Sequence, residues 1–335
     1  MVDPVSSLTD DVKPIEAGAH VTAAAFLGAT PVLALGDGTV VIVSAGNDQR
    51  VTLHDDGAIL VAACAGQKLI TGGGDGRVNA IDAQGNREEI ADEKGKWIDS
   101  LVGRDDFSIA WSTGRQVRAR DPKGVIKSFT APSSVRGLAY APKGYRLAIA
   151  HYNGATLWFP NTAAPIETLD WKGAHLDAIF SPDGRFLVTS MQENALHGWR
   201  LTDKRDMRMS GYPAKTRSFS WSPDGHWLAT SGADACVVWP FKDKDGPMNK
   251  EPRECGVRQA KVSRVAFHPK APVLAIGYDD GWVLLVRLSD AAEILVRRPA
   301  DEEQDPVSAL AWDQAGTRLL FGTTEGKAGI LHMPA

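Results

Sequence analysis

The sequence predicts an all-β fold assembled from repeated four-stranded sheets, and three observations support this prediction. Two stretches of the 335-residue chain, FSPDGRFLVTS at 180–190 and WSPDGHWLATS at 221–231, are nearly identical. Short runs rich in Val, Ile, Leu and aromatic residues alternate with Gly, Asp, Asn and Pro along the chain, which is typical of strands joined by turns. No stretch shows a convincing helical periodicity over three turns, so no helical layer is expected.

Aligning the chain on these two stretches gives an internal repeat of about 40 residues. Each repeat has one residue that ends its first strand, and these anchors are Phe26, Cys64, Val102, Tyr140, Phe180, Trp221, Phe267 and Trp312. Tight turns such as Asp37-Gly38 and Asn153-Gly154 come before the third strand, because Asn-Gly and Asp-Gly accept the positive φ angles of two-residue hairpins. A fourth, more polar strand follows, as at 49–55 and 165–171.

Four antiparallel strands in a repeat of this length predict the blade of a β-propeller. The eight anchors predict eight blades in a single domain spanning residues 1–335. Seven blades are the alternative if one weak repeat, most readily the third, does not form a blade of its own. Ala or Ser stands just before six of the eight anchors, as expected where the first strands crowd together.

The ends of the chain predict how such a propeller closes. The eighth repeat stops at Ala335 before its outer strand, whereas residues 11–20, DVKPIEAGAH, precede the first repeat and have no partner of their own. Because a bare sheet edge invites pairing, we expect this N-terminal segment to complete the C-terminal blade.

The repeats resemble a known family. The SPDG turns at 181–184 and 222–225, the Asp-Gly turns, and a Trp near the end of the third strand at Trp158, Trp199 and Trp239 are similar to those of WD40-repeat proteins. The resemblance covers nearly the whole chain and implies a degenerate, stand-alone propeller. The family's His–Ser–Asp–Trp hydrogen-bond network is expected to be incomplete in every repeat, although the sixth keeps Ser231, Asp234 and Trp239.

Composition and motifs narrow the function. A formal net charge of -4 argues against a nucleic-acid partner held by phosphate contacts. The three cysteines have no CxxC spacing, the N-terminus has no basic and apolar leader, and no apolar run approaches the length of a membrane helix, so we expect a cytoplasmic protein without a membrane partner. No HExxH, GxSxG or P-loop pattern occurs, and we assign no catalytic residue, metal or cofactor.

Two functions remain open, since propellers host both. The favoured one is a non-enzymatic, monomeric scaffold for a protein or peptide partner, expected to be acidic. The resemblance implies docking on the face that carries the loops before the first strands and the tight turns, where we expect His20, Lys96, Tyr152, Lys215, Lys261 and Tyr278. The alternative is a hydrolase or lactonase with a cation at the central channel, where the two carboxylates and the guanidinium of Asp99, Asp177 and Arg264 would hold a metal or polarise a substrate.

Overall fold

The computed structural model describes residues 6–44, 46–299 and 304–334, and they are almost entirely strands and turns. No α-helix occurs among these residues, and the only helical element there is a single 3-10 turn, η1 (Thr9–Asp11). The all-β fold predicted from the sequence is therefore confirmed.

The chain divides into two compact units, and each is described by itself. Unit 1 comprises residues 1–35 and 212–335, and unit 2 comprises residues 36–211. The strands of unit 1 are β1 (Ser6–Ser7), β2 (Val12–Glu16), β3 (Val21–Leu27), β4 (Thr30–Leu35), β21 (Phe219–Trp221), β22 (Trp227–Thr230), β23 (Cys236–Pro240), β24 (Arg253–Cys255), β25 (Val262–Phe267), β26 (Val273–Tyr278), β27 (Val283–Arg287), β28 (Glu293–Arg297), β29 (Val307–Trp312), β30 (Arg318–Thr323) and β31 (Lys327–His332).

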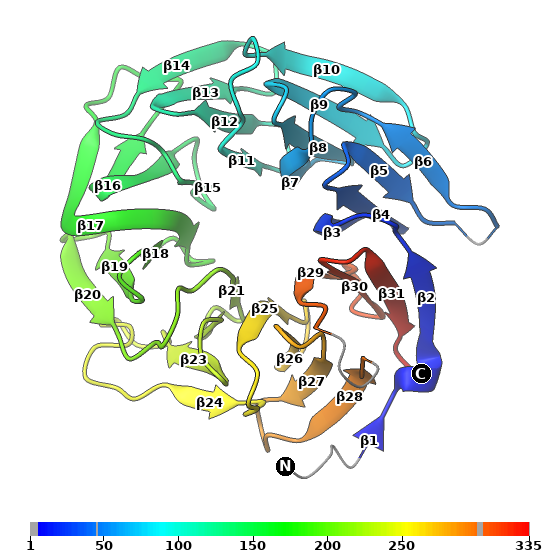
Figure 1. Cartoon of the computed structure of the whole chain (residues 1–335). Coiled ribbons are helices and arrows are strands. Elements are labelled where there is room, and N and C mark those ends of the chain that lie inside the picture. The colour runs from blue at the N-terminus through cyan, green and yellow to red at the C-terminus, as the bar shows by residue number, and fades with distance from the viewer. Residues whose placement is uncertain (1–5, 45, 300–303, 335) are drawn as a thin grey trace. The chain divides into compact units, whose positions relative to one another are not determined.

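Unit 2 carries the remaining strands (Figure 1). They are β5 (Thr39–Ile42), β6 (Gln49–Thr52), β7 (Ile59–Ala65), β8 (Lys68–Gly73), β9 (Arg77–Asp82), β10 (Arg87–Asp92), β11 (Ser100–Gly103), β12 (Ile109–Thr113), β13 (Gln116–Arg120), β14 (Ile126–Thr130), β15 (Gly137–Tyr140), β16 (Leu147–Trp158), β17 (Glu167–Phe180), β18 (Phe186–Met191), β19 (Leu196–Arg200) and β20 (Arg205–Met209).

The described strands form seven sheets. Unit 1 contains β2-β31-β30-β29, β21-β22-β23-β24 and β1-β28-β27-β26-β25, and unit 2 contains β10-β9-β8-β7, β11-β12-β13-β14 and the six-stranded β15-β16-β17-β18-β19-β20. The seventh sheet has the order β3-β4-β5-β6, and the boundary between the units falls after β4. The prediction of eight separate blades is therefore wrong in its sheet count, and the alternative of seven is what the structure has.

The difference arises at the fourth and fifth repeats rather than at the third. Each of the eight anchors lies in a strand of its own, but β16 and β17 each run through two segments that the sequence predicts as separate strands. The first half of β16 pairs with β15, its second half pairs with the first half of β17, and the second half of β17 pairs with β18. Residues 167–180 form one hydrogen-bonded strand although the chain bends at Gly173, whose φ is +126°, so the two repeats share one sheet.

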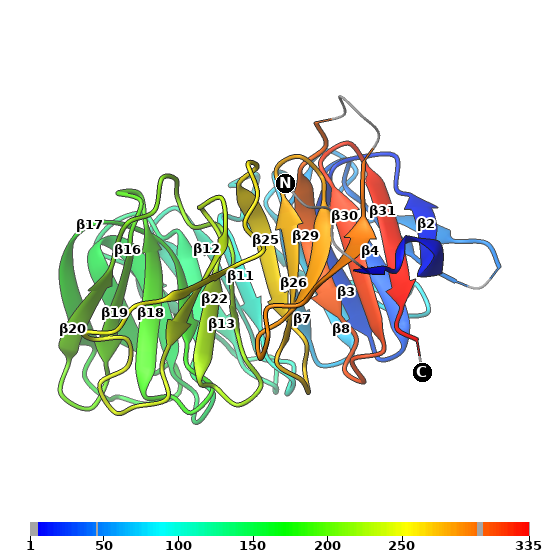
Figure 2. The same cartoon turned by 90° about the horizontal axis from the view of Figure 1, so that it is seen from below.

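The closure predicted from the chain ends is confirmed within unit 1. Strand β2 lies antiparallel to β31, with Val12 opposite Leu331 and Glu16 opposite Lys327, and the two strands are neighbours in Figure 2. The backbone N–H of Ala17 also donates to the carbonyl of Gly326, at 2.8 Å. The N-terminal segment thus covers the sheet edge that β31 would otherwise expose.

Neighbouring first strands approach each other very closely. In unit 2, a Cβ on Gly103 would lie 2.2 Å from the Cys64 carbonyl oxygen, and a Cβ on Gly137 would lie 2.4 Å from the Cα of Asp177. In unit 1, the hydroxyls of Ser263 and Ser308 donate to carbonyls of the next first strand, at 2.7 and 2.6 Å. Only very small side chains therefore fit where these strands meet.

The apolar core lies between the faces of consecutive sheets. In unit 2, for example, Ile70, Val78, Ile98, Ile109 and Trp111 form one buried cluster between the sheets that contain β8 and β12. The aromatic positions that recur in the sequence serve the same purpose, since Phe180, Trp199, Trp239 and Phe267 are all buried. Burial of this kind supplies most of the favourable free energy of folding.

Removing the closing contact tests its importance. Ile15 of β2 is buried and lies opposite Ala328 of β31. We predict that Ile15→Ala lowers the free energy of unfolding by about 3 kcal/mol, because a large-to-small change in a core leaves a cavity. Urea denaturation measures this, with the exposed Lys13→Ala on the same strand as control, expected to change stability by less than about 0.5 kcal/mol. Equal unfolding midpoints for the two variants would contradict the closure.

Candidate functional site

One end of the sheets of unit 2 carries the loops that lead into the first strands and the turns between second and third strands. We call this end the loop face, and it comprises residues 54–60, 73–76, 93–98, 152–154, 171–175 and 191–195. Its segments contact one another in pairs: a Cβ on Gly57 would lie 2.7 Å from the Asp75 nitrogen, and a Cβ on Gly76 would lie 2.7 Å from the Gly95 nitrogen. The loop face is therefore packed as closely as the strands beneath it.

The loop face presents an exposed tryptophan. Trp97 is 67% exposed and Leu60 is 37% exposed. Both approach Gly74, since the Trp97 ring and the Leu60 Cδ1 come within 4 Å of where a Gly74 Cβ would stand. The neighbouring Ile98 is fully buried and its N–H donates to the Gly73 carbonyl, which holds the loop and turns Trp97 outward. Tryptophan is highly buried on average in folded proteins, and tryptophan is enriched at protein–protein interfaces.

A pocket opens elsewhere on the loop face, over β16–β20. It has a volume of about 390 Å³ and we call it the Trp171 pocket. It is lined by Tyr152, Trp171, Lys172, Gly173, Met191, Glu193, Ala195 and Arg208. Tyr152, which the sequence analysis assigned to a docking face, is 55% exposed at its edge. The structure thus brings one predicted docking residue to a cavity.

The floor of the Trp171 pocket rests on a buried histidine. The ring of His197 stacks on Trp171 at 4.0 Å between centroids and meets Trp199 edge-on at 4.7 Å. Both ring nitrogens of His197 are buried without a hydrogen-bond partner. Burial, with smaller contributions from His175 and Arg208, lowers the pKa of His197 to about 3, so this ring is neutral at physiological pH.

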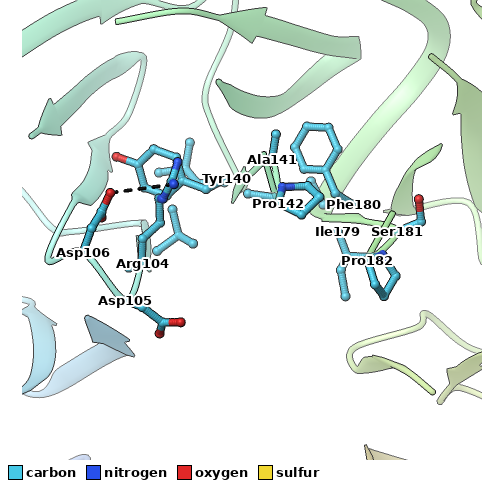
Figure 3. A pocket seen from close by; sticks show the side chains of 15 residues that line it. Arg104, Asp105, Asp106, Tyr140, Ala141, Pro142, Ile179, Phe180, Ser181 and Pro182 are labelled. Carbon is cyan, nitrogen blue, oxygen red and sulfur yellow. Dashed lines mark ion pairs between the residues drawn. The ribbon is translucent and has the colours of Figure 1, made fainter. Parts of the chain in front are cut away.

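A second cavity lies at the opposite ends of β11, β15 and β17, with a volume of about 580 Å³ (Figure 3). Two of its charged groups, Arg104 and Asp106, pair with each other. Arg104 donates to the Gly144 carbonyl at 2.5 Å, lies 3.7 Å from Asp106, and has its guanidinium 5.5 Å from the ring centroid of Tyr140. Burial raises the pKa of Tyr140, which keeps its hydroxyl neutral. Arg104, the cation of this cavity, therefore already has partners within the protein.

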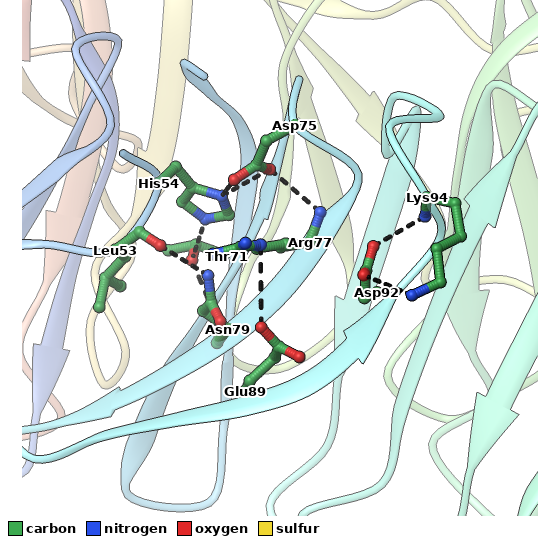
Figure 4. Close-up of polar contacts among 9 residues, drawn as sticks. All are labelled: Leu53, His54, Thr71, Asp75, Arg77, Asn79, Glu89, Asp92 and Lys94. Carbon is green, nitrogen blue, oxygen red and sulfur yellow. Dashed lines mark hydrogen bonds and ion pairs between the residues drawn. The ribbon is translucent and has the colours of Figure 1, made fainter. Parts of the chain in front are cut away.

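A hydrogen-bonded histidine fixes the turn of the loop face that contains Asp75. The Nδ1 of His54 lies 2.9 Å from the Asp75 carboxylate, and its Nε2 lies 2.8 Å from the Thr71 hydroxyl (Figure 4). Asn79 donates to the Leu53 carbonyl next to it, at 2.7 Å. Three members of the network expected from the family resemblance, with Thr in place of Ser, are thus present, and the sequence analysis did not name them.

In unit 1 a tyrosine forms the network of the sixth repeat. The Tyr212 hydroxyl accepts a hydrogen bond from the Trp239 ring N–H at 2.6 Å and lies 2.7 Å from the Thr230 hydroxyl. Trp239 takes part in this hydrogen-bond network, as expected from the sequence, but Ser231 and Asp234 do not. Ser231 instead accepts from the backbone N–H groups of 217 and 218, and Asp234 is exposed. The Tyr212 hydroxyl reaches Thr230, one position before Ser231.

The structure places the other predicted docking residues as follows. In unit 2 Lys96 is exposed beside Trp97, and in unit 1 His20 and Lys261 are exposed and Lys215 is partly buried. Tyr278 is a wrong prediction, because it is fully buried and its hydroxyl donates to the Gly256 carbonyl. The Tyr278 ring belongs to the core cluster around β25–β27, so it offers no surface to a partner.

The predicted channel residues each have local partners. In unit 2 the N–H of Gly114 donates to Asp99 at 2.6 Å, and the N–H of Ala178 donates to Asp177 at 2.8 Å. Solvent reaches Asp177, yet crowding by protein atoms raises the pKa of its carboxyl to about 6. In unit 1 Arg264 donates to the Ser308 carbonyl at 2.6 Å. Across the described part of the chain, no group of three or more His, Cys, Asp or Glu could hold a metal ion.

Comparisons with known proteins bear on the fold. The family model described as anaphase-promoting complex subunit 4 WD40 domain matches residues 265–334, and that of the WD domain, G-beta repeat, matches residues 207–239. The crystal structure of the C-terminal WD40 domain of Sif2 superimposes with a TM-score of 0.76 at 12% identity, covering 97% of this chain and 99% of that one. The fold of the chain is that of a WD40-repeat β-propeller.

A second solved structure is similar over nearly the whole chain, and curated proteins are similar over shorter segments. The computationally designed Ika8 protein superimposes with a TM-score of 0.75 at 16% identity, over 94% of this chain and 97% of that one. WD repeat-containing protein 1-B of Xenopus laevis is 38% identical over 82 residues, 24% of this chain and 14% of that protein. Autophagy-related protein 21 of Schizosaccharomyces pombe is 26% identical over 98 residues, 29% of this chain and 27% of that protein.

The propeller thus spans less than a third of the length of either of these two curated relatives. In the described residues no helix has the length and apolar character needed to cross a membrane.

The histidine under the Trp171 pocket gives this WD40 propeller a testable pH dependence. The pKa of His197 is about 3 in the folded state and 6.5 in an unfolded chain, so the unfolded state binds more protons between these values. Stability is therefore retained above pH 6.5 and lost as the pH falls toward 3. From pH 7 to pH 5 the loss due to His197 is about 2 kcal/mol.

We predict that His197→Phe removes this part of the pH dependence, because a phenyl ring keeps the stacking and binds no proton. Urea denaturation at pH 7 and pH 5 measures the difference, with the exposed His332→Phe as control. If His197→Phe and the wild type lose equal stability over this interval, His197 is not the buried neutral group described.

Proposed function

We propose that this WD40 propeller is a non-enzymatic protein-interaction module that binds a peptide segment of a partner on the loop face of unit 2. The carrying observation is Trp97, which is 67% exposed next to Leu60 and Lys96 although its neighbour Ile98 is fully buried. Tryptophan is among the residues that dominate binding energy at interfaces. The proposal includes the cytoplasmic location and monomeric state expected from the sequence.

The surroundings of Trp97 support this role. Its loop is tied to the second repeat through the Ile98 N–H and the Gly73 carbonyl, and the hairpin there is fixed by His54 and Asp75. A partner would therefore meet a surface that is already ordered, which lowers the entropic cost of binding. Lys96, exposed beside the ring, favours an acidic partner over a basic one. No observation favours the hydrolase alternative.

Selection from a library of random peptides displayed on phage tests the proposal. Enriched peptides are synthesised with a fluorophore, and their affinity for each variant is measured by fluorescence polarisation. We predict that Trp97→Ser weakens binding at least about tenfold, as loss of a hot-spot tryptophan does. Its unfolding transition stays unchanged, because the side chain is mostly exposed.

The matched control is Ile166→Ser, an exposed apolar residue of the same unit that precedes β17. Ile166 lies in the connection between third and fourth strands, outside the loop face, so this variant should bind as the wild type does. A failure to enrich any peptide, or equal affinity of Trp97→Ser and wild type, would refute the proposed surface.

A further inference from the structure

We propose that the Trp171 pocket holds one apolar side chain of the partner peptide and that an acidic residue next to it pairs with Lys172 and Arg208. This inference rests on the proposed function and names the chemistry of the partner at a second place on the loop face. All residues involved belong to unit 2.

The apolar part of the pocket is built from aromatic and thioether groups. Trp171 forms the floor, Met191 and Ala195 are buried beside it, and Tyr152 stands exposed at the edge. A volume of about 390 Å³ lies within the range of pockets that accept small ligands. Such a cavity suits a Leu, Met or aromatic side chain, because binding there removes the apolar surface of both the side chain and the pocket walls from water.

The floor is held rigidly from below. His197 stacks on the Trp171 ring at 4.0 Å, and the His175 ring donates from Nε2 to the Trp171 carbonyl at 3.1 Å. Ring and backbone of Trp171 are thus both fixed before any partner arrives. A preformed floor loses little conformational freedom on binding.

Gly173 keeps the pocket open. A Cβ at this position would lie 2.6 Å from the Met191 methyl carbon and 3.0 Å from the Glu193 carboxylate oxygens. The φ of Gly173 is +126°, which other residues rarely adopt. The backbone therefore lines the cavity at this point without a side chain that would fill it.

The charges around the pocket are unequal. Lys172 and Arg208 are both exposed, and no ion pair engages either of them among the described residues. The one carboxylate in the lining, Glu193, accepts a hydrogen bond from the Ala174 N–H at 3.3 Å. The Asp206 carboxylate is 3.8 Å from the His197 Nε2 and is not part of the lining. The rim thus has two cations without a partner, against one carboxylate that is already engaged.

This surplus of positive charge favours an acidic partner at the pocket. An acidic side chain of the partner would complete both ion pairs, whereas a basic one would meet two like charges. The cavity at the opposite strand ends differs on this point, because its Arg104 is already paired with Asp106 and with the Gly144 carbonyl. The occupant is therefore an acidic peptide with one apolar anchor.

A charge-reversal experiment tests the proposal with the same library of random peptides displayed on phage. We expect the wild type to enrich peptides with Asp or Glu beside an apolar residue. The double variant Lys172→Glu, Arg208→Glu should bind those peptides at least about tenfold more weakly and should enrich basic peptides instead. Tyr152→Ser should weaken binding without a change in charge preference, since it alters only the apolar edge.

The control variant Lys123→Glu, Lys127→Glu changes the net charge by the same amount at two exposed lysines outside the loop face. It should leave both affinity and charge preference as in the wild type. If the control variant loses as much affinity as the pocket variant, the effect is one of overall charge and the proposal is overturned.

The outcomes separate this inference from the proposed function. Peptides that depend on Trp97 but not on Lys172, Arg208 or Tyr152 would overturn the pocket and leave the proposed surface standing. Peptides that depend on the pocket but not on Trp97 would overturn the proposed surface around Trp97 and leave the pocket standing. If the wild type associates with itself in analytical ultracentrifugation and the pocket variant does not, the occupant is a second copy of the chain and the acidic partner is overturned. Failure to enrich any peptide would overturn both.

Discussion

The close approach of neighbouring first strands is the constraint on which the rest of this propeller depends. In unit 2 the backbones meet so closely at Gly103 and Gly137 that neither position has room for a Cβ. In unit 1 the same kind of contact is bridged by the hydroxyls of Ser263 and Ser308. Bulky side chains therefore pack between the faces of the sheets, as Ile109 and Trp111 do. The loops that begin these strands are brought into contact with one another as a consequence.

The repeat pattern was sufficient to predict this arrangement in outline. The near-identical stretches at 180–190 and 221–231 gave the period, and the Ala or Ser before most anchors indicated the crowding of the first strands. The pairing of β2 with β31 followed from an unpaired edge. The number of sheets did not follow, because β16 and β17 stay paired with their neighbours on both sides of residues where the sequence predicts an interruption. Asn153 and Gly154 do adopt the positive φ angles of a turn, yet both remain within the hydrogen-bonded strand β16.

The candidate site was harder to predict, for reasons that differ between residues. Tyr152 was found because it lies at a tight turn, and it is exposed. Tyr278 holds the corresponding position in another repeat but is drawn into the core by the Gly256 carbonyl, which no local pattern reveals. Trp97 was overlooked although it directly precedes the apolar Ile98. Its exposure depends on Gly74, which comes from a different repeat and leaves the ring uncovered.

Replacement of Gly137 by alanine tests the central constraint most directly. A methyl group there would lie 2.4 Å from the Cα of Asp177 and 2.8 Å from its carbonyl carbon, and backbone atoms cannot yield as a side chain can. Urea denaturation of Gly137→Ala should show a loss of about 3 kcal/mol, whereas Gly46→Ala, with nothing within 4 Å, should unfold almost as the wild type does. Unchanged stability of Gly137→Ala would contradict the account, because the first strands would then have room that this packing does not allow.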